Sequence, residues 1–211
     1  MRTTAVVMAK APVPGRVKTR LCPPCSPTEA AAIAEAALVD TLAAVAGTSV
    51  DRRVLVLDGA PGPWLPPGFD VVAQSDGDLD RRLDAAWREV DGPAIQIGMD
   101  TPQVSPAALD AALDCVTTAS VDAVLGLALD GGWWLVGFAT PPTGAFAGVP
   151  MSRPDTGARQ LERLRELGLA VAMVPTLRDI DTFDDALAVA ELLPGSSTEH
   201  ALRRVGVALP A

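Results

Sequence analysis

Ala5-Val-Val-Met-Ala-Lys-Ala-Pro-Val-Pro-Gly-Arg-Val-Lys-Thr-Arg-Leu21 joins an apolar run directly to a basic loop. The apolar run predicts a buried strand, and an α/β sheet binds its ligand at the carboxyl end of such a strand. The loop contains Lys10 and Lys18, the only two lysines of the chain, together with Arg16 and Arg20. Because the protein carries a formal net charge of -9, this cationic loop predicts an anion site, and a phosphate-bearing substrate is the first expectation.

Strand-like and helix-like segments alternate along the rest of the chain. Strands are expected at residues 53–58, 69–73, 94–98, 121–129, 133–138 and 169–174. Helices are expected at residues 26–46, 78–90, 155–167 and 182–193, from residue 105 onward, and as a short helix in the tail 195–211. The alternation predicts a mainly parallel sheet with helices on both faces, in a single domain over residues 1–211.

Composition excludes several classes of protein. The chain has 211 residues, of which 49% are hydrophobic, enough for one sizeable core. No apolar stretch reaches the roughly 18 residues of a membrane span, and no signal-type segment opens the chain, so a soluble cytoplasmic protein is expected. A pI near 4.5 argues against a nucleic-acid partner. A homodimer stays open as an alternative to a monomer.

Cysteine and histidine offer little further chemistry. Cys22, Cys25 and Cys115 are too few and odd in number for a disulfide framework. Cys22-Pro-Pro-Cys25 lacks two further zinc ligands, and apolar packing around a stiff turn is favoured over a redox pair. His200 is the only imidazole, which argues against Ser-His or Cys-His catalysis. The glycine spacings of the phosphate-binding loop and of the dinucleotide fingerprint are absent after the first strand.

Three acidic motifs are expected at the same edge of the sheet as the basic loop. They are Asp100 at the end of one strand, Asp130-Gly-Gly132 after another, and Asp179-Ile-Asp-Thr182 late in the chain. Each has a structural alternative as a turn, a hairpin or a helix N-terminus. Together, aspartates facing lysine and arginine across a cleft predict a site for magnesium and phosphate.

These motifs resemble the nucleotide-diphospho-sugar transferase superfamily, and most closely the radical-SAM/selenodomain-associated transferase family. The opening loop, Asp100-Thr-Pro102, Asp130-Gly-Gly-Trp-Trp-Leu-Val-Gly137 and the late Asp-x-Asp motif match that family in order, over roughly residues 5–190. The resemblance implies a three-layer α/β/α domain of the glycosyltransferase-A type.

A more distant resemblance is to the 2-phospholactate guanylyltransferase family. It implies that Lys18 and Arg20 bind phosphates, that Asp100 and Asp181 share a Mg²⁺ (or Mn²⁺) ion, and that residues 152–156 lie near the acceptor. With Asp179 of the late Asp-x-Asp motif, the expected metal ligands are Asp100, Asp179 and Asp181. One departure is that Trp133-Trp134 stands where that family has a Thr-Asn pair. Strand alternation places one of the two tryptophans in the core.

The function expected from these resemblances is a magnesium-dependent nucleotidyltransferase that moves a nucleoside monophosphate from a triphosphate to a small acceptor. A glycosyltransferase using a nucleotide sugar, and a nucleotide-binding module without turnover, are the alternatives. The catalytic residues expected are Lys18, Asp100 and Asp181. Residues expected to bind the nucleotide phosphates are Lys10, Gly15, Arg16, Lys18 and Arg20. Residues expected to bind the acceptor are Asp130, Gly131, Gly132, Trp133, Ser152 and Thr156.

Overall fold

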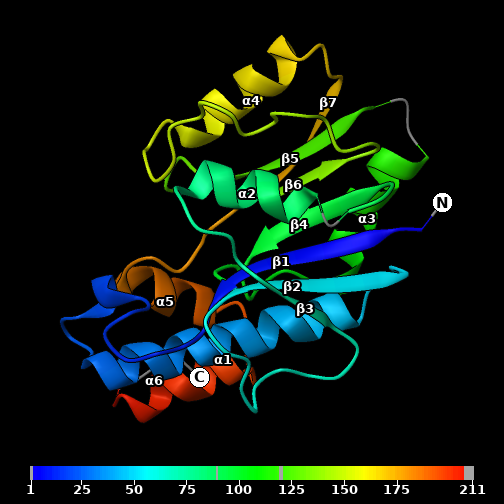
Figure 1. Cartoon of the computed structure of the whole chain (residues 1–211). Helices are drawn as coiled ribbons and strands as arrows, with labels where there is room; N and C mark the ends of the chain where they lie inside the picture. The colour runs from blue at the N-terminus through cyan, green and yellow to red at the C-terminus, as the bar shows by residue number, and fades with distance from the viewer. Residues whose placement is uncertain (1, 89, 119–120, 207–211) are drawn as a thin grey trace.

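The computed structural model describes residues 2–88, 90–118 and 121–206. In this part of the chain, seven strands form one sheet in the order β3-β2-β1-β4-β6-β5-β7 (Figure 1). The strands are β1 (Thr4–Lys10), β2 (Arg52–Asp58), β3 (Asp70–Ala73), β4 (Ala94–Gly98), β5 (Ala123–Ala128), β6 (Trp133–Phe138) and β7 (Val171–Leu177). Only β6 runs antiparallel to its neighbours β4 and β5. The mainly parallel sheet expected from the sequence is therefore confirmed.

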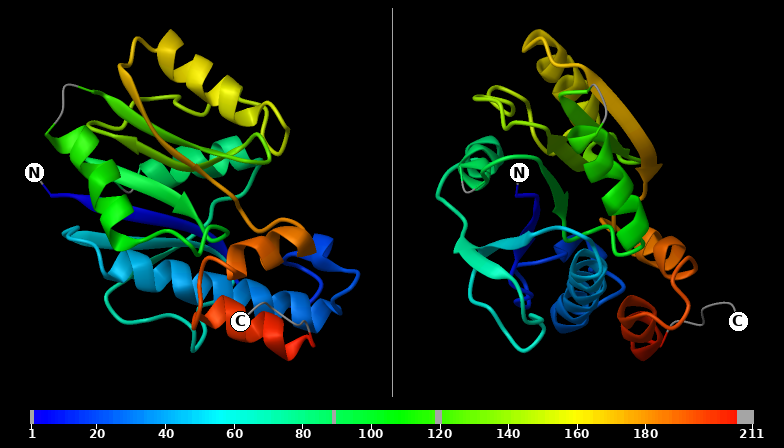
Figure 2. Two further views of the ribbon diagram at one scale, coloured as in Figure 1. Left: turned by 180° about the vertical axis from the view of Figure 1, so that it is seen from behind. Right: turned by 90° about the vertical axis from the view of Figure 1, so that its right-hand side faces the viewer.

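Helices cover both faces of this sheet. They are α1 (Pro27–Ala46), α2 (Leu79–Trp87), α3 (Pro106–Thr117), α4 (Thr156–Glu166), α5 (Phe183–Ala190), α6 (Ser197–Arg204) and the short 3-10 helix η1 (Thr19–Leu21). Helices α1 and α3 pack on one face, and α2 and α4 pack on the other (Figure 2). Across the described residues, no helix combines the length and apolar character needed to cross a membrane.

Local sequence signals explain where the helices begin. Ser26 and Glu29 form a reciprocal capping box at the start of α1, with a proline in the first turn, as expected. Thr182 and Asp185 form the same motif before α5. The tail helix is present as α6, whose N-cap is Ser196, and the expected positions 207–211 lie outside the described residues.

A third cluster of apolar residues ties the basic loop to the helical layer. Leu21 of η1 and Cys25 are buried against α1, and Ile180 and α5 pack on the same cluster. The cysteines Cys22, Cys25 and Cys115 are free, and the apolar role expected for Cys25 agrees with its burial. This cluster holds the basic loop and the late acidic segment side by side.

Strand direction decides where the functional motifs lie. Strands β1, β4, β5 and β7 run in one direction, because β6 is antiparallel to both of the strands that it separates. Their carboxyl ends therefore meet at one edge of the sheet. The basic loop, Asp100, Asp130 and the segment Asp179–Asp181 follow those ends, so the topology brings the predicted motifs together.

Candidate functional site

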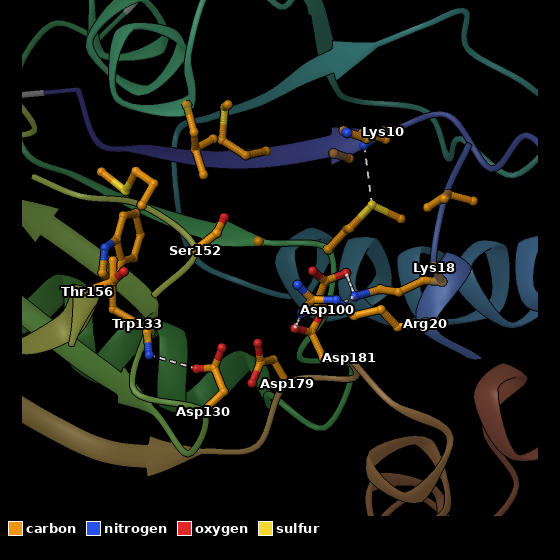
Figure 3. A pocket seen from close by; sticks show the side chains of 18 of the residues that line it. Lys10, Lys18, Arg20, Asp100, Asp130, Trp133, Ser152, Thr156, Asp179 and Asp181 are labelled. Carbon is orange, nitrogen blue, oxygen red and sulfur yellow. Dashed lines mark hydrogen bonds and ion pairs between the residues drawn. The ribbon is translucent and has the colours of Figure 1, made fainter. Parts of the chain in front are cut away.

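An open cavity of about 910 Å³ lies at this edge of the sheet, a volume typical of small-molecule sites. Most of the residues predicted for the site line it. These are Lys10, Arg16, Lys18, Arg20, Asp100, Asp130, Gly132, Trp133, Ser152, Thr156, Asp179 and Asp181. Figure 3 shows Lys10, Lys18 and Arg20 on one side, the aspartates between, and Trp133, Ser152 and Thr156 on the other. Gly15 and Gly131 are not among the lining residues.

Lys18 is the innermost cation of the basic loop. It adopts the left-handed conformation, with φ 49° and ψ 39°, just before η1, a backbone that is strained for lysine. Its Nζ lies 2.9 Å from Asp100 Oδ1 and 3.4 Å from Asp181 Oδ1, and its side chain is 8% exposed. Burial lowers the pKa of Lys18, but the charges and hydrogen bond of its aspartate neighbours outweigh that effect and raise it above 10.5.

The other cations of the loop are more accessible. Arg20 is 70% exposed in its side chain and pairs with Asp181 at 3.0 Å. Lys10 and Arg16 are exposed, and within the described residues neither forms an ion pair. Gly15 turns the loop with φ +75°. The basic loop therefore contributes to the cavity one enclosed cation, one that is paired but exposed, and two that are available to an anion.

Three carboxylates gather beside these cations. Asp130, Asp179 and Asp181 each present an oxygen atom within 4.8 Å of the others. The expected metal set contained Asp100 in place of Asp130. In this structure, Asp100 is paired with Lys18, and Asp130 completes the group of three, although both line the same cavity.

The charge on these carboxylates is incompletely balanced. Burial raises the pKa of Asp179, and the nearby charges of Asp130, Asp181 and Asp100 raise it further, from 3.8 to about 6. When neighbouring carboxylates raise the pKa of a carboxyl group, binding a proton or a cation reduces the repulsion between their negative charges. This donor set of carboxylate oxygens is the kind that Mg²⁺ and Mn²⁺ prefer, so the residues fit a divalent ion.

Backbone hydrogen bonds fix the acidic segments to one another. The Ile180 N–H donates to the Asp100 carbonyl at 2.8 Å, and the Leu129 N–H donates to the Leu177 carbonyl at 3.0 Å. The Gly132 N–H donates to Asp130 Oδ1 at 2.7 Å. The carboxylates are therefore held on strand ends that hydrogen-bond to each other.

The segment expected to bind the acceptor packs tightly against the Asp-Gly-Gly turn. Gly131 has φ +90°, and a Cβ at this position would overlap the carbonyl group of Pro154. The Gly157 N–H also donates to the Gly131 carbonyl at 2.8 Å. Gly131 therefore positions the segment instead of lining the cavity.

The hydroxyl groups of Thr156 and Ser152 differ in burial and hydrogen bonding. The buried Thr156 hydroxyl donates to the Pro150 carbonyl and accepts from the Arg153 N–H, so it holds the turn together. Ser152 is exposed in a left-handed conformation with φ 57°. Of these two residues, Ser152 is the one with a hydroxyl accessible to a ligand.

The structure separates the roles of the two adjacent tryptophans. Trp134 is 4% exposed and donates from Nε1 to the Pro175 carbonyl, whereas Trp133 is half-buried and lines the cavity. The register shifts beside this pair, between Gly126 and Leu127. Gly126 makes room for the indole, since a Cβ there would lie 2.6 Å from Trp134 Nε1.

Sequence reasoning missed several polar residues that line the cavity, among them Gln74, Arg82 and Gln96. Gln74 donates to the carbonyls of Ala9 and Val56 and accepts from Arg82 Nη1 at 2.9 Å. Its position at the carboxyl end of β3 was the available signal. For Gln96, the signal was a lone polar residue within an otherwise buried strand.

Comparison with solved structures agrees with this fold. A Desulfovibrio desulfuricans G20 protein described as a nucleotide-diphospho-sugar transferase superposes with a TM-score of 0.85 at 25% identity, covering 97% of this chain and 95% of that one. Rv0371c from Mycobacterium tuberculosis H37Rv, solved as a manganese complex, gives a TM-score of 0.55 at 22% identity, covering 90% of this chain and 98% of that one. The fold is therefore the nucleotide-diphospho-sugar transferase type, as expected.

Sequence comparison then identifies the family. Residues 30–153 match the family described as "uncharacterized protein conserved in bacteria (DUF2064)", and the chain belongs to it. The chain is also 34% identical over 174 residues to a phosphoenolpyruvate guanylyltransferase from Conexibacter woesei, covering 77% of this chain and 76% of that protein. These relationships confirm the superfamily resemblance and identify the protein as a transferase.

Proposed function

We propose that the protein is a metal-dependent nucleotidyltransferase that joins a nucleoside monophosphate to a small anionic acceptor. The observation that carries this proposal is Lys18, enclosed between Asp100 and Asp181 beside the acidic cluster and within one cavity. Phosphoryl transfer requires cationic side chains that bind the phosphates and, close to them, carboxylates that hold a divalent ion. The name of the Conexibacter relative makes GTP and phosphoenolpyruvate the first donor and acceptor to test.

The reaction would be a substitution at the α-phosphorus of the donor. An oxygen of the acceptor forms a bond to that phosphorus, the bond from the α-phosphorus to the bridging oxygen breaks, and pyrophosphate leaves. Lys18, Arg20, Lys10 and Arg16 would bind the phosphates and stabilise the charge that develops on the leaving group. Residues 130–156, with the free hydroxyl of Ser152, would position the acceptor for in-line attack.

A divalent ion would be held by Asp179 and Asp181, with Asp130 and Asp100 as the neighbouring carboxylates. When bound, Mg²⁺ or Mn²⁺ supplies positive charge to the phosphate oxygens. Rv0371c, a protein of the same fold, was solved as a manganese complex, which supports a divalent ion as a ligand. Because phosphate oxygens compete for the Lys18 ammonium, donor binding would weaken its pairing with Asp100 and leave that carboxylate free for the metal.

Sugar transfer from a nucleotide sugar is a second candidate, favoured by the description of the Desulfovibrio protein. The two reactions release different products, so the purified protein should be incubated with each nucleoside triphosphate plus phosphoenolpyruvate, and separately with nucleotide sugars. Magnesium-dependent pyrophosphate release together with a nucleotidylated acceptor, detected by mass spectrometry, is the expected result. Nucleoside diphosphate release from a nucleotide sugar would instead establish sugar transfer, and binding without either product would indicate a non-catalytic module.

A further inference from the structure

The segment expected to bind the acceptor contributes a single cationic side chain to the cavity. The residues of segment 130–156 that line the cavity, a segment described throughout, are Asp130, Gly132, Trp133, Met151, Ser152, Arg153, Pro154 and Thr156. Among them only Arg153 is positively charged. Figure 3 shows its neighbours Ser152 and Thr156 across the aspartates from the basic loop. Arg153 therefore supplies positive charge to a part of the cavity that the basic loop does not border.

The backbone of Arg153 is fixed on both sides. Its N–H donates to Thr156 Oγ1 at 3.0 Å, and its carbonyl accepts from the Thr156 N–H at 3.1 Å. The next residue, Pro154, packs so closely on Gly131 that a Cβ at Gly131 would overlap its carbonyl. Ser152 has φ 57°, a conformation that costs free energy in a non-glycine residue and that is concentrated at ligand sites. The Arg153 backbone is therefore held beside the Asp-Gly-Gly turn.

The guanidinium group of Arg153, in contrast, has few partners. The side chain is 62% exposed, and its Nε lies 3.3 Å from Asp155 Oδ1. Neither terminal nitrogen, Nη1 or Nη2, forms a hydrogen bond or an ion pair with a described residue. An exposed ion pair of this kind contributes little to stability. Asp155 also lies 3.4 Å from Arg159 Nε, so it keeps a partner when the Arg153 side chain turns toward an anion.

Arg82 is the other arginine outside the basic loop that lines the cavity, and it is less available. Its Nη1 donates to Gln74 Oε1 at 2.9 Å. Gln74 is itself fixed, because its Nε2 donates to the carbonyls of Ala9 on β1 and Val56 on β2. Gln74 thus holds Arg82 toward the ends of β1 and β2. Of the two arginines, Arg153 is the one that belongs to the acceptor segment.

We propose that Arg153 determines acceptor specificity by binding, through Nη1 and Nη2, an anionic group of the acceptor that does not react. This inference rests on the proposed nucleotidyl transfer. In that reaction, a phosphate oxygen of the acceptor forms the bond to the α-phosphorus and pyrophosphate leaves, so no bond forms or breaks at Arg153. The two terminal nitrogens match the two oxygens of a carboxylate, and we therefore assign a carboxylate to this position.

The charges around the segment explain why such a carboxylate needs an arginine. Asp130 lies at the start of the segment, and its carboxylate is within 4.8 Å of those of Asp179 and Asp181. The phosphate and the carboxylate of one acceptor cannot both lie against these three groups without strong repulsion. Arg153 offers the acceptor carboxylate a second place on the same segment, and the phosphate is then left to face the donor. In-line attack depends on such an orientation.

Arg153→Gln tests the proposal, because it removes the charge and keeps a polar side chain. With saturating GTP and Mg²⁺, we expect the KM for phosphoenolpyruvate to rise by about tenfold or more, the loss expected when a charge-assisted hydrogen bond is removed. The kcat should change by less than about threefold, and the KM for GTP by less than about twofold, since the interaction lost is made equally in the ground state and the transition state. Arg153→Lys keeps the charge without the paired nitrogens, so it should recover part of the affinity.

Ethyl phosphate separates the two anionic groups, because it has a phosphate and no carboxylate. Its inhibition constant against phosphoenolpyruvate should agree within about twofold between the wild type and Arg153→Gln. Arg159→Gln is the matched control, because Arg159 pairs with the same Asp155 carboxylate and is 55% exposed, but it does not line the cavity. The KM for phosphoenolpyruvate should be unchanged in that control.

The outcomes distinguish this inference from the proposed function. An unchanged KM for phosphoenolpyruvate in Arg153→Gln, or an equal weakening of phosphoenolpyruvate and ethyl phosphate, overturns the role of Arg153 while nucleotidyl transfer stands. An equal loss in Arg159→Gln also overturns it, because the effect would then come through Asp155. Pyrophosphate release only with acceptors that lack a carboxylate has the same consequence. If the wild-type protein releases no pyrophosphate with any nucleoside triphosphate and acceptor, the proposed function is overturned along with the role of Arg153.

Discussion

Lys18 and Asp179 lie in the same cavity, and their surroundings affect them in opposite ways. Burial opposes the charge on Lys18, but Asp100 and Asp181 more than compensate and raise its pKa. Burial also opposes the charge on Asp179, and there the neighbouring carboxylates add to the effect and raise its pKa to about 6. The charged form of Lys18 is thus stabilised by the protein, whereas the charged form of Asp179 is not, so we expect the acidic cluster to recruit a cation.

Asp100 connects the two sides, and its removal should have the largest effect. Asp100→Asn removes the carboxylate that pairs with Lys18 and, under the proposed mechanism, one metal ligand. We expect magnesium-dependent pyrophosphate release to be lost while the circular dichroism spectrum is retained, because the residue lies at the surface of a cavity. Undiminished turnover would contradict the assignment.

Asp130→Asn is the matched comparison, since Asp130 belongs to the acidic cluster but forms no ion pair with Lys18. We expect it to raise the Mg²⁺ concentration needed for half-maximal turnover. Excess Mg²⁺ should therefore restore more of the turnover in Asp130→Asn than in Asp100→Asn.

The two lysines provide the next test, because they belong to one loop but differ in burial. Lys18→Met should lower turnover by about 100-fold or more, the size of effect seen when a preorganised charge is removed from a developing negative charge. Lys10→Met should cost at most about tenfold, because Lys10 is exposed and its charge is screened by solvent. An equal loss in both variants would show that the enclosed position of Lys18 has no special role.

Much of this arrangement could be predicted from the sequence because it depends on local signals. The capping boxes at Ser26 and Thr182 define where two helices begin, and apolar runs define the strands. Once the strands are parallel, their carboxyl ends must share an edge. That rule brings the segments with Lys18, Asp100 and Asp181 to one edge of the sheet, and the apolar cluster that contains Leu21 and Ile180 then holds the basic loop beside the late acidic segment.

The details that sequence did not predict depend on packing between distant segments. The structure groups Asp130 with Asp179 and Asp181 and pairs Asp100 with Lys18, and no spacing in the sequence reveals this arrangement. The orientation of Trp133 and Trp134 depends on packing, since Trp134 occupies the space that Gly126 leaves beside a register shift between Gly126 and Leu127. Gln96 has a sequence signal, but its isolation from every described hydrogen-bond partner appears only in three dimensions.

The smallest expected effect is on the free energy of unfolding. It tests, without any substrate, whether the acidic cluster of Asp130, Asp179 and Asp181 lacks a compensating positive charge. The pKa of Asp179 is about 6 in the folded protein, and its ordinary value is 3.8. Between pH 3.8 and pH 6, Asp179 is therefore protonated in the folded protein but ionised in the unfolded chain. This contribution to stability is therefore complete below pH 3.8 and is lost as the pH rises through 6. After allowance for solvent screening of a partly exposed group, it amounts to about 1–2 kcal/mol.

Asp179→Asn should remove this pH dependence. At pH 7.5 we expect the variant to be more stable than the wild type by about 1–2 kcal/mol in urea unfolding, with the difference shrinking toward pH 4. Asp114→Asn, at an exposed aspartate on α3, controls for the substitution itself. Added Mn²⁺ should stabilise the wild type at pH 7.5 and lose its effect near pH 5, because a protonated carboxyl cannot bind a metal. A wild-type protein that gained no stability from Mn²⁺ at pH 7.5 would show that the acidic side is balanced by some means other than a metal.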